Sequence, residues 1–165
     1  MSVVWRIGTD APACTADDLT GAGAEITGGR WNRKGTPMLY AASSRALACL
    51  ETVVHLNASD LPLNRYLVAI DIPDDLIAAA IRFDAVAHVG WDAIPEGRVS
   101  MDVGEAWAKS SGSAVMIVPS VIVPEEMNFL INPKHMDARA INASKHRKWT
   151  YDRRLKSTPA SRGSR

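Results

Sequence analysis

The chain has 165 residues, of which 47% are hydrophobic and 22% charged, and its net charge is +1. These values are typical of one globular domain with a sizeable core. No apolar run reaches the roughly 20 residues that span a bilayer, and the N-terminus lacks the pattern of a secretory signal. We therefore expect a cytoplasmic protein. Its two cysteines, Cys14 and Cys49, make no disulfide framework, and a reduced core thiol is the simplest explanation for Cys49.

Charge is unevenly distributed along the chain. Residues 145–165 carry a net charge of +7, whereas the remaining residues carry −6. A basic C-terminal tail can bind nucleic acid or an acidic partner, although surface solvation is the commoner explanation. No helix-turn-helix, zinc-finger or aromatic RNA-binding signature accompanies the tail. A non-catalytic nucleic-acid-binding module is therefore kept as an alternative of another class.

The first half of the chain predicts short strands around one amphipathic helix. Ser43 or Ser44 can cap this helix, because serine is a preferred N-cap residue. The expected elements are a strand at 3–7, a loop at 8–27 with room for one helical turn, a strand-like segment at 28–32, a turn at 33–35, a strand at 37–41 and a helix from Ser43 or Ser44 to about Leu56.

The second half of the chain predicts mainly strands. They are expected at 65–72, 114–123, 127–132 and 148–153, with a helix at 102–110 that has Val103, Ala106 and Trp107 on one side. Pro119 cannot donate to a sheet, so it indicates an edge or a bend. The pattern indicates an α+β domain at 1–156, with mixed or antiparallel sheets and flanking helices, and a disordered basic tail at 157–165.

Common nucleotide and metal motifs are absent. The glycines at 21, 23, 28 and 29 follow no predicted strand, so they do not form a dinucleotide-binding turn. There is no phosphate-binding Gly-x4-Gly-Lys-Ser/Thr loop. His55, His88, His135 and His146 are scattered without metal-ligand spacing, so we expect no metal.

Glu51 lies within the apolar stripe of the predicted helix. At 100° per residue, it falls about 40° from Leu47, and Ser44 and His55 lie close to the same line. A carboxylate on a buried face loses hydration and needs a partner or a function. The simpler explanation is a boundary glutamate paired with a nearby arginine.

Two residues from preceding segments point to a function for this carboxylate. Arg30 provides a planar fork that suits a phosphate or pyrophosphate. Tyr40 provides an aromatic plate, although plain core packing also explains it. Together with Glu51, they can hold a dinucleotide and polarise its glycosidic bond. When nicotinamide leaves NAD, positive charge develops on the ribose, and a fixed carboxylate stabilises that transition state.

The order of several motifs resembles the RES-domain family. The similarity extends from about Trp5 to Leu155. The motifs are Gly28-Gly-Arg-Trp-Asn32, Tyr40-Ala-Ala-Ser43, Leu47-Ala-Cys-Leu-Glu-Thr-Val-Val-His55, Val118-Pro-Ser120, Asn128-Phe-Leu-Ile-Asn-Pro-Lys-His135 and Tyr151-Asp-Arg-Arg-Leu155. The family is named for an Arg, a Glu and a Ser, which match Arg30, Glu51 and Ser120.

The resemblance implies a toxin of a bacterial type II toxin–antitoxin system, with a fold similar to diphtheria-toxin-type ADP-ribosyltransferases. It implies NAD as the substrate and no separate cofactor. Family activities include NAD degradation by phosphorolysis or hydrolysis, and ADP-ribosyl transfer to a protein. The implied partner is an antitoxin with an Xre-like DNA-binding region. We expect cleavage of the nicotinamide–ribose bond that depletes NAD by phosphorolysis or hydrolysis. The alternative is mono-ADP-ribosyl transfer to a metabolic protein of the host, since the sequence does not identify the acceptor.

By position, the resemblance implies that Arg30 binds the NAD phosphates and that Tyr40 stacks on nicotinamide or its ribose. Glu51 would be the catalytic carboxylate, and Ser120 would bind substrate or orient the arginine. A strand-bend serine after Pro119 is the structural alternative for Ser120.

Further candidates for the rim of the NAD site are Ser44, His55 and Asn128. For Asn128, and for His135 nearby, a structural role in the turn around Asn132-Pro133 is an equal alternative.

Overall fold

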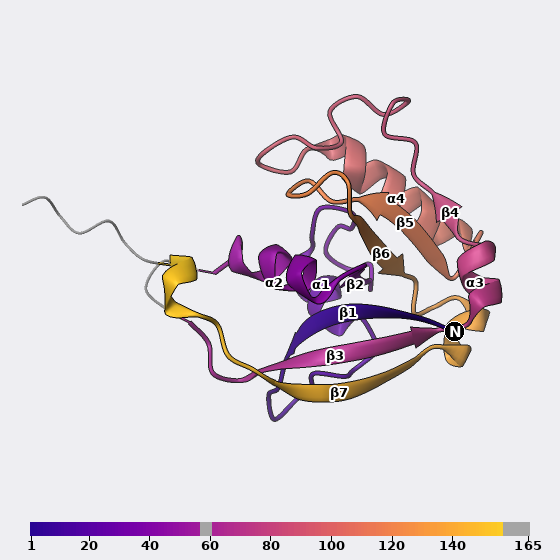
Figure 1. Cartoon of the computed structure of the whole chain (residues 1–165). Coiled ribbons are helices and arrows are strands. Elements are labelled where there is room, and N and C mark those ends of the chain that lie inside the picture. The colour runs from indigo at the N-terminus through magenta and orange to yellow at the C-terminus, as the bar shows by residue number, and fades with distance from the viewer. Residues whose placement is uncertain (57–60, 157–165) are drawn as a thin grey trace, which may run out of the picture.

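The structure is a computed structural model that describes residues 1–56 and 61–156. In this part of the chain, strands form a single twisted sheet in the order β4-β5-β6-β2-β1-β3-β7, and helices pack around it (Figure 1). Only β4 and β5 are parallel neighbours, whereas every other neighbouring pair is antiparallel. The α+β class with a mixed sheet is therefore confirmed, and the architecture is consistent with an ADP-ribosyltransferase-like fold.

No helix of the described residues is long and apolar enough to cross a membrane.

Helices and strands are interspersed along the chain, and neighbouring strands of the sheet often come from distant segments. The strands are β1 (Ser2–Thr9), β2 (Leu39–Ala42), β3 (Arg65–Ile72), β4 (Ile81–Arg82), β5 (Val115–Pro119), β6 (Met127–Ile131) and β7 (Asn142–Trp149); the helices are α1 (Ala22–Thr27), α2 (Arg45–Val53), α3 (Asp74–Ala78) and α4 (Arg98–Ser110), with 3-10 turns η1 (Met136–Ala140) and η2 (Arg153–Lys156).

Several predicted boundaries are confirmed and others are wrong. The strand at 65–72 is β3, and Ser44 is the N-cap of α2, where its Oγ accepts a hydrogen bond from Leu47 N at 3.1 Å. The predicted strand at 114–123 ends at Pro119, where the chain turns. β4 pairs with β5 only at Met116 and Ile117, so at Pro119 the strand is paired with β6 alone. The helix predicted at 102–110 begins at Arg98, and Ala106 is exposed and not on its buried side.

Two strand predictions fail for identifiable reasons. Residues 28–32 form a tight turn, since Gly28 has a φ of 72° and Gly29 bridges to Asn32. The last strand is Asn142–Trp149 and not 148–153. It lies at the edge of the sheet and is exposed along most of its length, so its sequence lacks the alternation of a half-buried strand. The predicted disordered tail from Ser157 lies outside the described residues.

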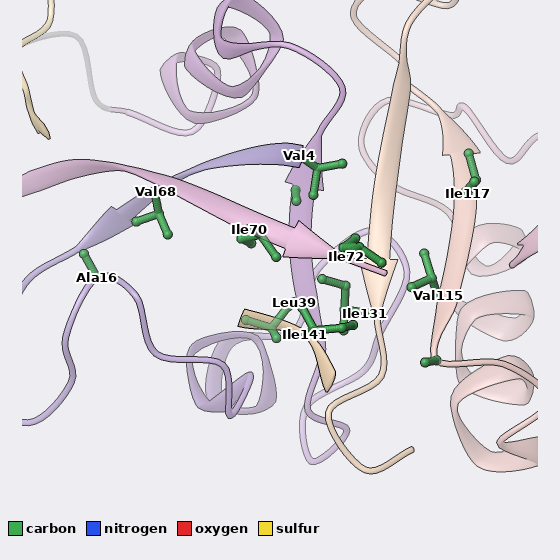
Figure 2. Packing of buried hydrophobic residues seen from close by; sticks show 12 residues of the cluster. Val4, Ala16, Leu39, Val68, Ile70, Ile72, Val115, Ile117, Ile131 and Ile141 are labelled. Atoms are coloured by element: carbon green, nitrogen blue, oxygen red, sulfur yellow. The ribbon is translucent and has the colours of Figure 1, made fainter. Parts of the chain in front are cut away.

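The first face of the sheet carries a continuous aliphatic core. Figure 2 shows this cluster, in which side chains of the central and outer strands point to the same side. Its members are Val4, Ala16, Leu39, Ala41, Val68, Ile70, Ile72, Ala114, Val115, Ile117, Ile131 and Ile141.

The second face carries two separate apolar clusters. One includes Ala42 and the buried residues of α2, and the other includes Leu130, Val118 and Trp107 of α4. Opposite residues of an antiparallel pair share a face. Because Ala42 pairs with Asn128 and Tyr40 pairs with Leu130, Tyr40 and Asn128 stand on this second face, where the two clusters meet.

A glycine in α4 lets the helix approach the 28–32 turn closely. A Cβ atom added at Gly104 would lie 1.9 Å from the carbonyl oxygen of Trp31. Real contacts of this kind are never so short, so the helix or the turn would have to move. Glycine at 104 therefore allows α4 to pack directly against the backbone of Trp31, the residue after Arg30.

We predict that Gly104→Ala destabilises the protein by about 1–3 kcal/mol, the cost of overpacking a tight contact. The melting temperature should fall by about 3–10 °C. Gly23→Ala is the matched control, because a Cβ at Gly23 of α1 meets nothing within 4 Å. This control should keep or slightly raise the melting temperature. Equal melting temperatures for the two variants would contradict the close packing of α4 on the turn.

Candidate functional site

Glu51 on α2 accepts two hydrogen bonds from the neighbouring strands. Ser120 Oγ donates to Glu51 Oε1 at 2.9 Å, and Asn128 Nδ2 donates to the same oxygen at 2.6 Å. We call these three residues the Glu51 clamp. Among the described residues, no hydrogen bond is made to the second oxygen, Oε2. The clamp therefore holds one carboxylate oxygen and leaves the other available.

The turn after β5 explains why Ser120 donates to Glu51, because its backbone N–H groups use both lone pairs of the Ser120 hydroxyl. Ser120 is fully buried and follows β5 directly, where Pro119 ends the strand. Its Oγ accepts hydrogen bonds from the backbone N–H groups of Ile122 and Val123, at 3.0 and 3.1 Å. A hydroxyl has one proton and two lone pairs. Because both lone pairs are used, the single proton is directed at Glu51.

Asn128 is held in one orientation at a cost. The reverse orientation of its amide would place two oxygens 2.6 Å apart, since Glu51 Oε1 lies at that distance from Nδ2. In the orientation observed, Asn128 Oδ1 is buried and has no hydrogen-bond partner among the described residues. A buried acceptor without a partner costs roughly 1–3 kcal/mol. The placement of Asn128 is therefore better explained by the carboxylate than by stability.

Arg30 is oriented by a loop distant in sequence. Its Nη1 donates to the carbonyl oxygens of Trp91 and Ala93, at 3.2 and 3.0 Å. A guanidinium carries five N–H donors in a plane. The other donors, on Nε and Nη2, have no partner in the part of the chain that the structure describes, so the fork remains able to bind an anion.

Tyr40 fixes the 28–32 turn through its hydroxyl. It accepts from Trp31 N at 3.1 Å and donates to Asn32 Oδ1 at 2.6 Å. Burial raises the pKa of the Tyr40 phenol, and this outweighs the opposite effects of the Trp31 N–H and the Arg30 charge. The phenol therefore stays neutral and keeps its proton for Asn32. A Cβ at Gly29 would lie 2.8 Å from this hydroxyl, which explains the glycine there.

Sequence reasoning missed Glu126, which lies in the turn between β5 and β6. Its Oε2 accepts from Ser44 Oγ at 2.6 Å, and from Ser43 Oγ at 3.3 Å, at the start of α2. Its negative charge is favourable at a helix N-terminus. Glu126 and Ser120 thus fasten the 120–126 turn to both ends of α2. No spacing signal identifies Glu126, because its partners lie about 80 residues away.

The structure brings some predicted residues together and separates others. Glu51, Ser120 and Asn128 are in direct contact, and Arg30 lies in the turn held by Tyr40. Ser44 caps α2 and binds Glu126 and not Glu51. α2 ends at Val53 and not at Leu56, so His55 lies in the turn after the helix, where it is exposed. Among the described residues, no hydrogen bond joins the His55 side chain to the clamp. His135 caps η1, which agrees with its structural alternative.

Surface shape alone does not lead to this site. A shallow hollow of about 470 Å³ is lined by Leu19, Thr20, Glu25, Pro37, Pro133 and Lys134. None of the predicted site residues is among them. We therefore base the site on its hydrogen bonds and charges.

The clamp provides a fixed negative charge at the boundary between two apolar clusters. A carboxylate held this way can stabilise a cation that develops beside it, since it needs little reorganisation. The free donors of Arg30 can bind a phosphate. The arrangement therefore suits a substrate that combines a phosphate with a carbon centre that becomes positive.

Comparison with known proteins identifies the class. The model of the RES domain matches residues 3–154, so the chain belongs to the RES-domain family. A relative from Sphingobium sp. (strain YBL2), named "Prs ADP-ribosylating toxin", is 62% identical over 152 residues, which cover 92% of this chain and 94% of that protein. A protein named "Toxin Res" from Yersinia enterocolitica is 38% identical over 142 residues, covering 86% of this chain and 92% of its own.

The clamp can be tested by exchanging its donor and its acceptor. In Asn128→Asp, a carboxylate replaces the amide 2.6 Å from Glu51 Oε1, and the like charges should lower the melting temperature. In the double variant Glu51→Gln/Asn128→Asp, an amide again faces a carboxylate and the like charges are gone, so part of the loss should be recovered; the Ser120 proton then meets the amide nitrogen, so recovery should be incomplete. Thermal unfolding at pH 7 provides the measurement. A double variant no more stable than Asn128→Asp would contradict direct contact between the two side chains.

Proposed function

We propose that this protein is a bacterial toxin that cleaves the nicotinamide–ribose bond of NAD and transfers ADP-ribose to a protein. The observation that carries the proposal is the Glu51 clamp, in which Oε1 is held twice and Oε2 is left available. The relative that is 62% identical and named as an ADP-ribosylating toxin supports transfer to a protein, and its name makes Prs the first acceptor to test.

The reaction requires a stabilised positive charge and no covalent intermediate. The bond between ribose C1′ and the nicotinamide nitrogen breaks, and its electron pair leaves with neutral nicotinamide. Positive charge then develops on C1′ and the ring oxygen, where Glu51 Oε2 stabilises it. A lone pair of the acceptor forms the new bond to C1′, and the acceptor's proton passes to solvent.

Arg30 would anchor the pyrophosphate of NAD. Its contacts with the carbonyls of Trp91 and Ala93 use Nη1, which leaves the Nε and Nη2 donors for two phosphate oxygens. A pyrophosphate bound there would fix the ribose relative to Glu51. Tyr40 would serve this anchor mainly by holding the 28–32 turn, in addition to any stacking on nicotinamide.

Phosphorolysis and hydrolysis share the first step and differ only in the acceptor. Phosphate would give a phosphorylase, and water would give a glycohydrolase. NAD is the substrate in each case, and no separate cofactor is required. We also propose a cognate antitoxin of the Xre type, because uncontrolled loss of NAD would harm the host cell.

The assay measures nicotinamide release from NAD with phosphate, without phosphate, and with purified Prs and a labelled NAD. We expect label on Prs and release that does not depend on phosphate. Glu51→Gln should lower release by roughly 10²-fold or more, the loss of one electrostatic stabiliser, while it remains folded by circular dichroism. Wild-type turnover in this variant would return Glu51 to a structural role. Release that requires phosphate would favour a phosphorylase.

A second prediction concerns the anchor. Arg30→Lys can still donate to a carbonyl, but a single ammonium cannot form two parallel bonds to a pyrophosphate. NAD binding measured by calorimetry should therefore weaken in Arg30→Lys nearly as much as in Arg30→Ala. If Arg30→Lys binds NAD as well as the wild type, Arg30 does not act as a phosphate fork.

A further inference from the structure

In the loop between β4 and α4, several apolar side chains are unusually exposed to solvent. Residues 83–97, which we call the 83–97 loop, contain no helix or strand, and Figure 1 shows them extending beyond the sheet next to α4. Val86, Val89 and Ile94 are 89%, 86% and 83% exposed, more than any other large hydrophobic residue of the described chain. The three residues fall within nine positions of one loop, and apolar side chains exposed close together typically mark an interaction site.

The loop is anchored firmly, so this exposure is built into the fold. Asp84 Oδ1 accepts from the backbone N–H groups of Val86 and Ala87, at 3.0 and 3.1 Å. Trp91 is buried and stacks on Trp31 at a ring distance of 6.0 Å. A preorganised surface loses less conformational entropy on binding than a flexible one.

The same loop adjoins the candidate site. The carbonyls of Trp91 and Ala93 bind Arg30, and Ile94 directly follows them. A protein that offers a nucleophile to the ribose of bound NAD must place its surface beside Arg30. The apolar side chains of the loop are therefore available to such a protein.

Charge indicates the chemistry of this partner. The loop carries Asp84, Asp92 and Glu96 and contains no Lys or Arg. None of the three carboxylates forms an ion pair within the described residues. An apolar surface with acidic neighbours is complementary to an apolar surface bordered by Lys or Arg.

We propose that the 83–97 loop is the docking surface for the acceptor protein, which meets it with an apolar surface bordered by basic residues. This inference rests on the proposed transfer of ADP-ribose to a protein. A water or phosphate acceptor requires no such surface, because a small nucleophile can enter the site without contacting Val86 or Val89.

The test separates docking from chemistry. In the transfer assay with labelled NAD and purified Prs, the variant Val86→Ser/Val89→Ser should reduce labelling of Prs by about tenfold or more. The loss should arise mainly from a higher KM for Prs. Nicotinamide release without acceptor should stay within about twofold of the wild type, because neither residue touches the clamp or Arg30. Ile26→Ser/Leu63→Ser is the matched control, since these residues are 73% and 75% exposed outside the loop. It should leave labelling unchanged.

A charge variant tests the basic partner. Asp92→Lys should also reduce labelling, and added salt should then affect labelling less than it affects the wild type. Normal labelling by both Val86→Ser/Val89→Ser and Asp92→Lys would overturn the docking proposal and leave the proposed function intact. A parallel fall of labelling and of nicotinamide release would also overturn it, because the loop would then act on NAD. If the wild type releases nicotinamide and labels no acceptor, protein transfer fails and docking fails with it.

Discussion

The organisation of the site depends on one carboxylate oxygen. Glu51 Oε1 accepts hydrogen bonds from Ser120 and Asn128, and these bonds join α2 to the end of β5 and to β6. The three segments are separated by up to 77 residues in sequence. Charge-assisted hydrogen bonds are about twice as strong as neutral ones, so this contact fixes the side-chain geometry as well as the packing of α2.

The sheet places this polar contact where apolar packing is interrupted. On the first face, one aliphatic cluster is continuous, whereas on the second face two clusters meet near Tyr40 and Asn128. A continuous core would leave no room for a carboxylate. Among the described residues, Asn128 Oδ1 has no hydrogen-bond partner, which indicates that stability is not optimised there. Local costs of this kind concentrate at functional sites, where the rest of the fold compensates for them.

The sequence predicted those features that depend on local periodicity. Glu51 was identifiable because a helix places it beside Leu47, and β3 because its run of apolar residues is buried. The resemblance to the RES-domain family supplied Ser120, which periodicity alone did not single out. By contrast, Glu126 acts across about 80 residues, and the partners of Arg30 are backbone carbonyls. A carbonyl belongs to every residue type, so no sequence pattern marks the one that binds an arginine.

We assign different roles to the clamp and to the 83–97 loop: the clamp would stabilise the developing charge, and the loop would select the acceptor. In the proposed reaction, the charge that develops on the ribose is the same whether water, phosphate or a side chain attacks, so the clamp cannot select the acceptor. Selection requires contacts made only by one class of acceptor, away from the reacting carbon. Arg30 would connect the two parts, because its Nη1 binds the loop while its other donors make no hydrogen bond among the described residues. Under the proposed function, one arginine both holds the donor and supports the acceptor surface, so changes in the loop sequence would alter the target and leave the chemistry constant.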